Sequence, residues 1–261
     1  MKRDRQSVNL RHAEMLALIR ERQEVLVEEL SETFGISLMT VRRDLQALEE
    51  QGKISRFHGG ATVDMRAVAA DEKHEVALCR KLIARRAASL VNDGDSLLIN
   101  GSSTALAMLD CLGGKRVTVF TNNGLVCGRR FPPEVDLQLS GGTFRGQNHI
   151  LTGDLAMRNL MDVRADKAFL GCIGISPDGE ILCGIPSELG INETMIEHAD
   201  SYYILADYTK IGKTSAYASF HLEKKGTIVT DWRAPEAVVE QLRAIGMEVI
   251  QVQRSDYPNV K

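Results

Sequence analysis

The residues from Ser37 to Gln46 combine cationic, hydroxyl and amide side chains in a pattern that could contact nucleic acid. Val41, Leu45 and Leu48 recur at helical spacing, which predicts one buried stripe and an exposed opposite face. An arginine fork fits a guanine edge or a phosphate oxygen, and a hydroxyl near a helix start can donate to a phosphate. The side chains expected to face outward and meet DNA are Ser37, Met39, Thr40, Arg42, Arg43 and Gln46.

A second cationic group follows in the segment that ends at Gly59-Gly60. Lys53, Arg56 and His58 lie there on a short apolar–polar run typical of a β-wing, and they predict a second contact with DNA. The arginine-bearing helix alone fits equally well the solvated face of a protein-interaction module. That alternative predicts no salt-dependent DNA binding, and the added wing favours the DNA-binding interpretation.

Three loops rich in glycine and hydroxyl or amide side chains each follow a predicted strand. Glycine lets the backbone approach an anion, hydroxyls donate hydrogen bonds, and a following helix start supplies free N–H groups. One such loop is more often only a turn with a helix cap, but the carboxyl ends of parallel strands share one edge of a sheet, where ligands bind. Three loops together predict a site for a phosphorylated small molecule. Its expected residues are Asn100, Gly101, Ser102, Ser103, Thr104, Thr121, Asn122, Gly141 and Gly142.

Asp207 and Lys210 close another predicted strand and could hydrogen-bond sugar hydroxyls or transfer protons, although a surface ion pair would look the same. Lys81 is also placed in the expected site, and Glu188 is a lesser candidate. The six histidines are dispersed, and the five cysteines lack a C-x-x-C spacing. No catalytic set, metal site or cofactor is therefore expected.

The elements that must position the DNA-contacting residues are three helices and a wing. Helices are expected over 9–22 and 28–34, with Val25-Leu26-Val27 starting the second, and Gly35 stopping it. Ser37 is a good N-cap for the third helix, which Gly52 ends before a strand over 53–57. These features predict a winged helix-turn-helix domain over 1–61 and a linker over 62–75 that runs into a helix.

From residue 76 to 261, short apolar runs alternate with helical stretches, which predicts an α/β domain with a mainly parallel sheet and helices on both faces. Strands are expected over 96–100, 117–121, 136–139, 167–172, 202–207, 227–230 and 248–252. Helices are expected over 76–91, 105–112, 124–130, 190–198 and 236–245.

The bulk composition suits an ordinary globular protein, with 44% apolar and 26% charged residues. The net charge of −3 does not favour binding to DNA, and the first 60 residues carry as many basic as acidic side chains. Phosphate contact needs local cations, however, and those cluster at Arg42-Arg43 and in the wing. No apolar run is long enough for a membrane span or follows the basic start as in a secretory signal, so a cytoplasmic protein with free thiols is expected.

The sequence resembles the DeoR family of sugar-metabolism repressors along nearly its whole length. The residues that carry the resemblance are Phe34-Gly35-Ile36-Ser37, Thr40-Val41-Arg42-Arg43-Asp44-Leu45, His58-Gly59-Gly60-Ala61, Asp93-Gly94-Asp95, Gly101-Ser102-Ser103-Thr104, Ala168-Phe169-Leu170-Gly171, and Asp207 with Lys210. The resemblance implies a sensor domain similar in fold to ribose-5-phosphate isomerase, with a phosphorylated sugar or sugar acid as effector. It also implies a homodimer or homotetramer that represses from double-stranded operator DNA and releases it when the effector binds.

Two departures from the family pattern concern the expected effector site. Ser102-Ser103-Thr104 stands where the family usually has adjacent threonines after glycine, which conserves hydroxyl chemistry. Asp207-Tyr208-Thr209-Lys210 stands where the family has Asp-Ser-Ser-Lys, so a tyrosine is expected to alter the pocket and the choice of effector. The rival interpretation is a phosphosugar isomerase-like enzyme with a DNA-binding appendage, in which Asp207 and Lys210 act as acid and base.

Overall fold

The computed structural model describes residues 2–214, 218–221 and 226–257. The chain divides into two compact units, one ending at Glu75 and the other beginning at Val76. Within the described residues no helix combines the length and the apolar character that crossing a membrane requires. Each unit is described by itself.

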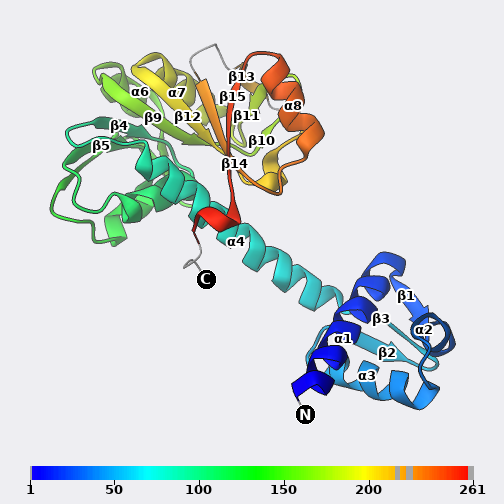
Figure 1. The fold of residues 1–261 in the computed structure, drawn as a ribbon. Helices are drawn as coiled ribbons and strands as arrows, with labels where there is room; N and C mark the ends of the chain where they lie inside the picture. Colours follow the sequence, from blue (N-terminus) through cyan, green and yellow to red (C-terminus); the bar gives the residue numbers. More distant parts are fainter. Residues whose placement is uncertain (1, 215–217, 222–225, 258–261) are drawn as a thin grey trace. The chain divides into compact units, whose positions relative to one another are not determined.

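The first unit contains three helices and a three-stranded antiparallel sheet (Figure 1). In chain order its elements are α1 (Lys2–Arg22), β1 (Glu24–Leu26), α2 (Val27–Phe34), α3 (Leu38–Glu50), β2 (Ile54–Phe57) and β3 (Gly60–Val63). The strands lie in the order β1-β3-β2. The core contains the stripe predicted for the third helix, because Val41, Leu45 and Leu48 are all buried against residues of α1 and α2. This is the winged helix-turn-helix fold expected from the sequence.

Local signals fix the turn between α2 and α3. Gly35 adopts a left-handed conformation with φ of 62° and ends α2, while Ser37 Oγ accepts a hydrogen bond from Thr40 N and begins α3. One prediction in this region is wrong: Val25 does not start the second helix but lies in strand β1. There it is buried between two exposed neighbours and pairs with Ala61 of β3, so that pairing with a distant strand overrides the helical start.

The segment 62–75, expected to be a linker, contains the end of β3 and the first part of helix α4 (Met65–Ser89). The helix therefore begins at Met65 rather than at Val76, and it continues without interruption across the boundary between the units (Figure 1). No glycine or proline interrupts 65–75, and its alanines are strong helix formers. The helix was not predicted because charged residues are mixed with these alanines, so the segment has no sustained apolar periodicity.

The second unit is organised around a seven-stranded parallel sheet in the order β15-β14-β12-β9-β4-β5-β6. Its strands are β4 (Ser96–Ile99), β5 (Val117–Thr121), β6 (Val135–Leu139), β9 (Ala165–Gly171), β12 (Ala199–Leu205), β14 (Gly226–Asp231) and β15 (Glu248–Val252). All seven correspond to strands predicted from short apolar runs. The mainly parallel α/β fold is therefore confirmed.

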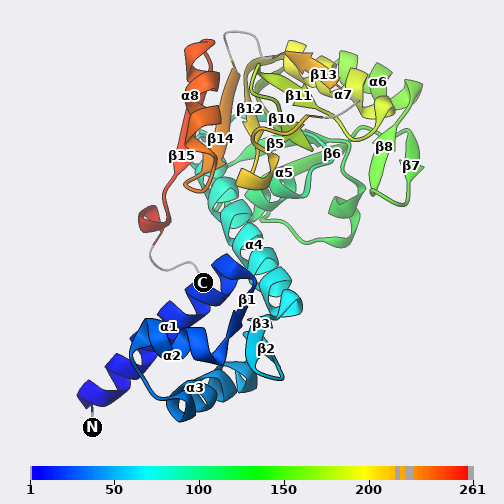
Figure 2. The same ribbon diagram turned by 90° about the vertical axis from the view of Figure 1, so that its right-hand side faces the viewer.

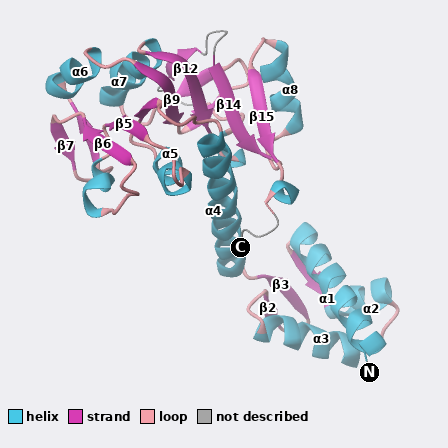
Figure 3. Ribbon diagram, turned by 60° about the vertical axis from the view of Figure 1, so that its left-hand side comes forward, coloured by secondary structure: helices cyan, strands magenta, loops and turns pink. Residues whose placement is uncertain are grey.

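Helices cover both faces of this sheet, which Figure 3 shows as a layer of strands between them. One core cluster joins α4, α5 (Ser103–Ala107) and the 3₁₀ turns η1 (Met108–Cys111) and η2 (Gly124–Gly128) to one face. The other joins α6 (Asp154–Met161), α7 (Pro186–Glu197) and α8 (Glu236–Ala244) to the opposite face. Alternate residues of a strand enter different clusters, as with Leu97 and Ile99 against Leu98.

Several short elements had no sequence signal. The hairpin of β7 (Thr143–Arg145) and β8 (Ile150–Thr152) lies beyond the edge of the main sheet (Figure 2). A small antiparallel sheet contains β10 (Gly174–Ile175), β11 (Glu180–Leu182) and β13 (Ala218–His221). Strands of two to four residues carry too few positions for an alternating pattern to be recognised. Both small sheets matter because they supply residues to the site described next.

Candidate functional site

The exposed face of α3 presents the side chains predicted to meet DNA. Arg42, Arg43 and Gln46 are exposed, and Met39 is 75% exposed although it is apolar. These four side chains line one shallow surface depression together with Thr40 and Arg56. The structure thus brings helix and wing residues together on one face, which was the arrangement expected for major-groove contact.

The remaining predicted DNA contacts, Ser37, Lys53 and His58, do not line this depression. Ser37 Oγ lies 2.9 Å from Thr40 Oγ1, at the start of α3. Lys53, just before β2, and His58, in the turn between β2 and β3, are both exposed. Arg56 is held by Glu49, since its backbone N–H donates to Glu49 Oε1 and its Nε lies 3.3 Å from Oε2. That ion pair ties the wing to α3.

Asp44 anchors the exposed helix to the rest of the first unit. It is only 3% exposed, and its Oδ2 accepts a 2.8 Å hydrogen bond from Arg11 Nε of α1. His12 Nε2 of the same helix lies 3.1 Å from Asp44 Oδ1. Asp44 therefore orients α3 on α1 instead of orienting its neighbours Arg42 and Arg43, a role that the sequence alone did not reveal.

In the second unit a cavity of about 300 Å³ opens at the carboxyl ends of β4, β9 and β12. From β4 the chain proceeds outward to β5 and β6 on one side, whereas β9 begins the other half of the sheet. Ligands bind at such a reversal of strand order because the two flanking loops separate there. The predicted residues that line the cavity are Asn100, Gly101, Ser102, Ser103, Thr104, Asp207 and Lys210.

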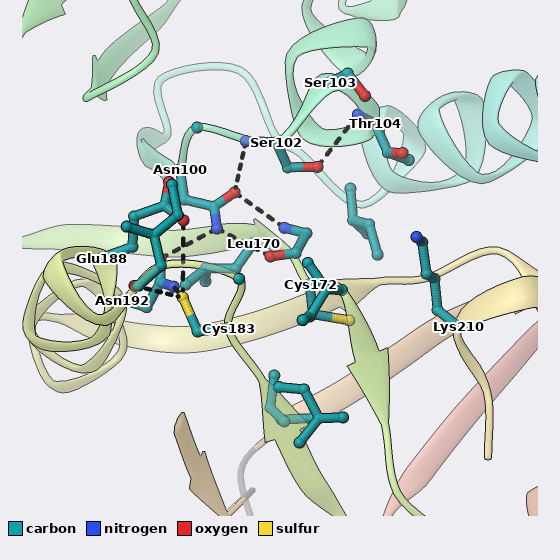
Figure 4. Close-up of a pocket in the computed structure, with 18 of the residues that line it drawn as sticks. Asn100, Ser102, Ser103, Thr104, Leu170, Cys172, Cys183, Glu188, Asn192 and Lys210 are labelled. Atoms are coloured by element: carbon teal, nitrogen blue, oxygen red, sulfur yellow. Dashed lines mark hydrogen bonds between the residues drawn. The ribbon is translucent and has the colours of Figure 1, made fainter. Parts of the chain in front are cut away.

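Asn100 joins the two halves of the sheet at this point. Its Oδ1 accepts hydrogen bonds from Ser102 N at 3.2 Å and Gly171 N at 3.0 Å (Figure 4). Its Nδ2 donates to Gly171 O at 3.0 Å and to Asn192 Oδ1 at 3.1 Å. Four bonds from one buried amide shape the loop after β4, so Asn100 positions the site and its amide is already satisfied.

Ser102 and Gly171 form the close contact between these strand ends. Ser102 Oγ caps α5 by accepting from Thr104 N and Ala105 N. A Cβ at Gly171 would lie 1.9 Å from that oxygen, so only glycine fits at the end of β9. The hydroxyl hydrogen of Ser102 and the exposed Ser103 remain as donors toward the cavity.

A cationic side of the cavity contains Lys210 and Arg80. Lys210 has no ion-pair partner in the part of the chain that the structure describes. Arg80 of α4 donates from Nε to Asp207 Oδ2 at 2.7 Å, while Thr209 N and Oγ1 donate to Asp207 Oδ1. Asp207 is 2% exposed and fully engaged, so it holds Arg80 and the 3₁₀ turn η3 (Tyr208–Lys210) in place.

Sequence reasoning placed Lys81 in the site, but the structure places Arg80 there. Lys81 is exposed and lies near Cys111, away from the residues that line the cavity. Arg80 stands three and four positions before the buried Ile83 and Ala84, on the apolar face of the helix. A lone arginine on an apolar helix face was the signal that could have identified it.

Four other predicted residues do not line the cavity. Thr121 is fully buried and donates from Oγ1 to Ile99 O at 2.6 Å, and Asn122 donates from Nδ2 to Leu151 O at 3.2 Å. These bonds fix β5 and the hairpin whose Ile150 does line the cavity. Gly141 and Gly142 adopt positive φ in the turn after β6, and a Cβ at Gly142 would meet Thr152 O at 2.6 Å. The turn after β6 lies away from the cavity because β6 is the edge strand, two strands from β4, whereas the loop after β5 lies beside the loop after β4 but Thr121 and Asn122 bond to the backbone instead of lining the cavity.

Tyr208 was expected to alter the pocket, yet it is absent from the residues that line it. The guanidinium carbon of Arg233 lies 4.3 Å from the centre of the Tyr208 ring, which packs against the second core cluster. Residues not foreseen in the cavity include Asn148, Cys172, Cys183 and Asn192. Burial raises the pKa of the Cys172 thiol to about 12, so this group is neutral at physiological pH. The described residues contain no cluster of His, Cys, Asp and Glu that could hold a metal ion.

A winged helix-turn-helix unit on the same chain as an α/β unit with a polar cavity defines a class: DNA-binding regulators with a separate sensor domain. Comparison with family models agrees with this. The DeoR-like helix-turn-helix domain matches residues 11–67, and the DeoR C-terminal sensor domain matches residues 77–232. The chain belongs to the DeoR family of transcription regulators.

Similar curated proteins cover nearly the whole chain. The HTH-type transcriptional repressor CsqR of Escherichia coli is 30% identical over 93% of this chain and 95% of its own length. The glycerol-3-phosphate regulon repressor of E. coli is 28% identical over 89% and 94%. Among solved structures, ribose 5-phosphate isomerase A of Methanocaldococcus jannaschii matches with a TM-score of 0.37 at 18% identity, covering 51% of this chain and 53% of its own.

Proposed function

We propose that the protein represses an operon for sugar or sugar-acid catabolism and leaves its operator when a phosphorylated sugar binds the sensor domain. The observation that carries the proposal is the cationic side of the cavity, where Lys210 lacks an ion-pair partner among the described residues. A phosphate group would supply the missing negative charge, and the hydroxyls of Ser102 and Ser103 would donate to its oxygens. Relatives named as repressors, one of them of a glycerol-3-phosphate regulon, support the same function.

The features of the first unit support the proposal that α3 recognises double-stranded DNA. Arg42 and Arg43 are adjacent on α3, and successive residues of a helix leave its axis in different directions, so one suits a base edge and the other a phosphate. Arg56, Lys53 and His58 of the wing extend the contact. Two protomers would place two such helices in successive major grooves of a palindromic operator, in a homodimer or homotetramer.

Helix α4 offers a route by which the cavity could influence the DNA-binding unit. It carries Arg80 at the cavity and continues without interruption to Met65. An anionic ligand would compete with Asp207 for the Arg80 guanidinium, so the bound and free states would hold α4 differently. Only a ligand with unequal affinity for two such states can shift the equilibrium between DNA-bound and released protein.

An isomerase-like activity gains little support from the cavity. Both oxygens of Asp207 already accept hydrogen bonds from Arg80 and Thr209, so this carboxylate lacks the freedom of a general base. We therefore propose a regulator that binds phosphosugars without converting them. Detection of turnover of a sugar phosphate by NMR would favour the enzyme instead.

The test is Lys210→Ala, with Lys213→Ala as the matched control because Lys213 is exposed and does not line the cavity. A thermal-shift screen of the wild-type protein against phosphate esters of sugars identifies the esters that stabilise it. Fluorescence anisotropy then measures release of labelled operator by those esters. We expect Lys210→Ala to bind the operator normally but to need at least about tenfold more ester for release. Normal release by Lys210→Ala, or loss of its operator binding, would contradict the proposal.

A further inference from the structure

The cavity has two ends of opposite chemical character. Figure 4 shows Lys210 on one side of the cavity and Glu188 with Asn192 on the other, with Cys172 between them. A ligand that fills the cavity therefore meets a cation at one end and a carboxylate at the other.

Glu188 is directed toward the loop after β4. A Cβ added at Gly101 would lie 3.2 Å from Glu188 Oε1, and the Cys183 thiol donates to Oε2 across 3.7 Å. Asn192, which is 6% exposed, donates from Nδ2 to the Cys183 sulfur at 3.4 Å. Carboxylate, thiol and amide thus form one contiguous polar wall at this end.

A simpler role for Glu188 would be to cap the start of α7, since it lies in the first turn of that helix. The helix shows no side-chain cap hydrogen bond, and its first turn begins instead with Pro186. Nor does Glu188 pair with a cation within the described part of the chain. Burial raises the pKa of its carboxyl, and the weak Cys183 donor only partly offsets this effect. The carboxylate consequently lacks strong donors, and the hydroxyls of a ligand would supply them.

We propose that Glu188 is a specificity-determining residue that selects phosphate esters of neutral sugars or polyols and rejects phosphorylated sugar acids. This inference rests on the proposed function and narrows it to one chemical class. The phosphate lies at the Lys210 end, and hydroxyls at the far end donate to Glu188. A sugar acid would place its own carboxylate against Glu188 in a partly desolvated space, where like charges repel strongly.

Reversing the ligand does not remove this repulsion. A phosphorylated sugar acid turned end for end would bring its carboxylate to Lys210, but its phosphate would then face Glu188. Both orientations of a molecule with two anionic ends are disfavoured, whereas a molecule with one anionic end has a favourable orientation. Arg80 and Asp207 also line the cavity but are paired with each other, so discrimination follows from Glu188 at one end and Lys210 at the other, which have no ion-pair partner among the described residues.

The experiment measures binding of two matched pairs of ligands to the full-length protein by calorimetry, with thermal shift as a second readout. The pairs are glucose 6-phosphate with 6-phosphogluconate, and glycerol 3-phosphate with 3-phosphoglycerate. For the wild type we expect the neutral ester of at least one pair to bind at least about tenfold more tightly than its acid. Glu188→Gln keeps the size of the side chain and removes its charge. We expect this variant to bind the acid about tenfold or more tightly than the wild type does.

Glu197→Gln on the same helix is the control, because Glu197 is exposed and does not line the cavity. It should keep the wild-type preference. Equal or tighter binding of the acids by the wild type, or an unchanged preference in Glu188→Gln, would overturn the inference while leaving phosphosugar sensing in place. Failure of all four compounds to bind the wild type would overturn the sensing function together with this inference.

Discussion

At the scale of single residues, the proposed recognition of DNA depends on a few side chains and not on bulk charge. Arg42 and Arg43 stand on the exposed face of α3, while Asp44 beside them is buried and faces the opposite way toward Arg11. Helical geometry thus places three consecutive charged residues on two faces of α3, two of them exposed and one buried. Under the proposed function the two arginines meet bases and phosphates, while the carboxylate keeps the helix in place.

Replacing these arginines separately should distinguish base reading from phosphate contact. Loss of a bidentate base contact in Arg42→Ala or Arg43→Ala is expected to cost about 1–3 kcal/mol of operator affinity and to relax sequence preference at one position. Loss of a phosphate contact should weaken all sequences alike and reduce the salt dependence. Anisotropy titrations at several salt concentrations measure both effects. Arg22→Ala, an exposed arginine at the end of α1, is the control, and unchanged affinity in both α3 variants would refute the assignment.

At the scale of elements, the most consequential difference from expectation is α4. Its second half carries Arg80 to the cavity, and its first half occupies most of the segment predicted as a linker. A continuous helix transmits a change in position along its axis far better than a flexible linker does. The proposed release of DNA therefore depends on the stiffness of this helix near the boundary between the units.

Lowering the helix stability of α4 should weaken the effect of sugar-phosphate binding on operator release without changing either binding site. Lys73 and His74 are exposed, so replacing both with glycine removes no buried contact but costs helix stability, about 1 kcal/mol per residue relative to alanine. We expect Lys73→Gly with His74→Gly to bind operator and sugar phosphate as the wild type does, but to release the operator much less completely. The matched control is Lys73→Ala with His74→Ala, measured in the same anisotropy assay. Full release by the glycine variant would show that α4 does not transmit the signal.

The sequence allowed the main elements to be predicted where local signals are strong. The Ser37 cap, the Gly35 stop and the Val41–Leu45–Leu48 stripe all act within a few residues, and each is present in the structure. The central strands β4, β5 and β14 were recognisable because most of their residues are buried, which leaves nearly continuous apolar runs, whereas the edge strand β6 shows an alternating pattern. Strand β1 depends on pairing with the distant strand β3, and the strands of the hairpin β7–β8 have only three residues each, so neither leaves a local pattern that could be recognised.

The candidate site was predictable only in part, and the reason is topological. Of the three loops predicted from residue type, the loop at Asn100–Thr104 lines the cavity because β4 lies at the reversal of strand order, where the cavity opens. The loops at Thr121 and Gly141 carry the same residue types but follow strands farther out in the sheet. Strand order is not encoded in any one loop, so glycine and hydroxyl content alone could not separate ligand contact from turn geometry.

At the scale of the whole molecule, the two units have separate cores and separate functions. The core of the first unit is built around Met15, Leu30 and Leu45, and it shares no residue with the two clusters of the second unit. Domains with separate cores can unfold in separate steps, so a single unfolding free energy does not describe such a chain. The single tryptophan, Trp232, packs against a cluster of the second unit and reports on that unit alone.

This separation makes the anchoring role of Asp44 testable in the intact protein. Asp44→Ala removes the buried partner of Arg11, and we expect the first unit to lose about 1–3 kcal/mol, since Arg11 stays 21% exposed and regains some hydration. Urea unfolding followed by circular dichroism should then show an earlier loss of helix, while the Trp232 fluorescence transition stays where it is in the wild type. Operator affinity should fall as the first unit unfolds, with sugar-phosphate binding retained. A shift of the Trp232 transition by the same amount would mean that the two units unfold as one, and an unchanged helix transition would mean that Asp44 contributes little to anchoring α3.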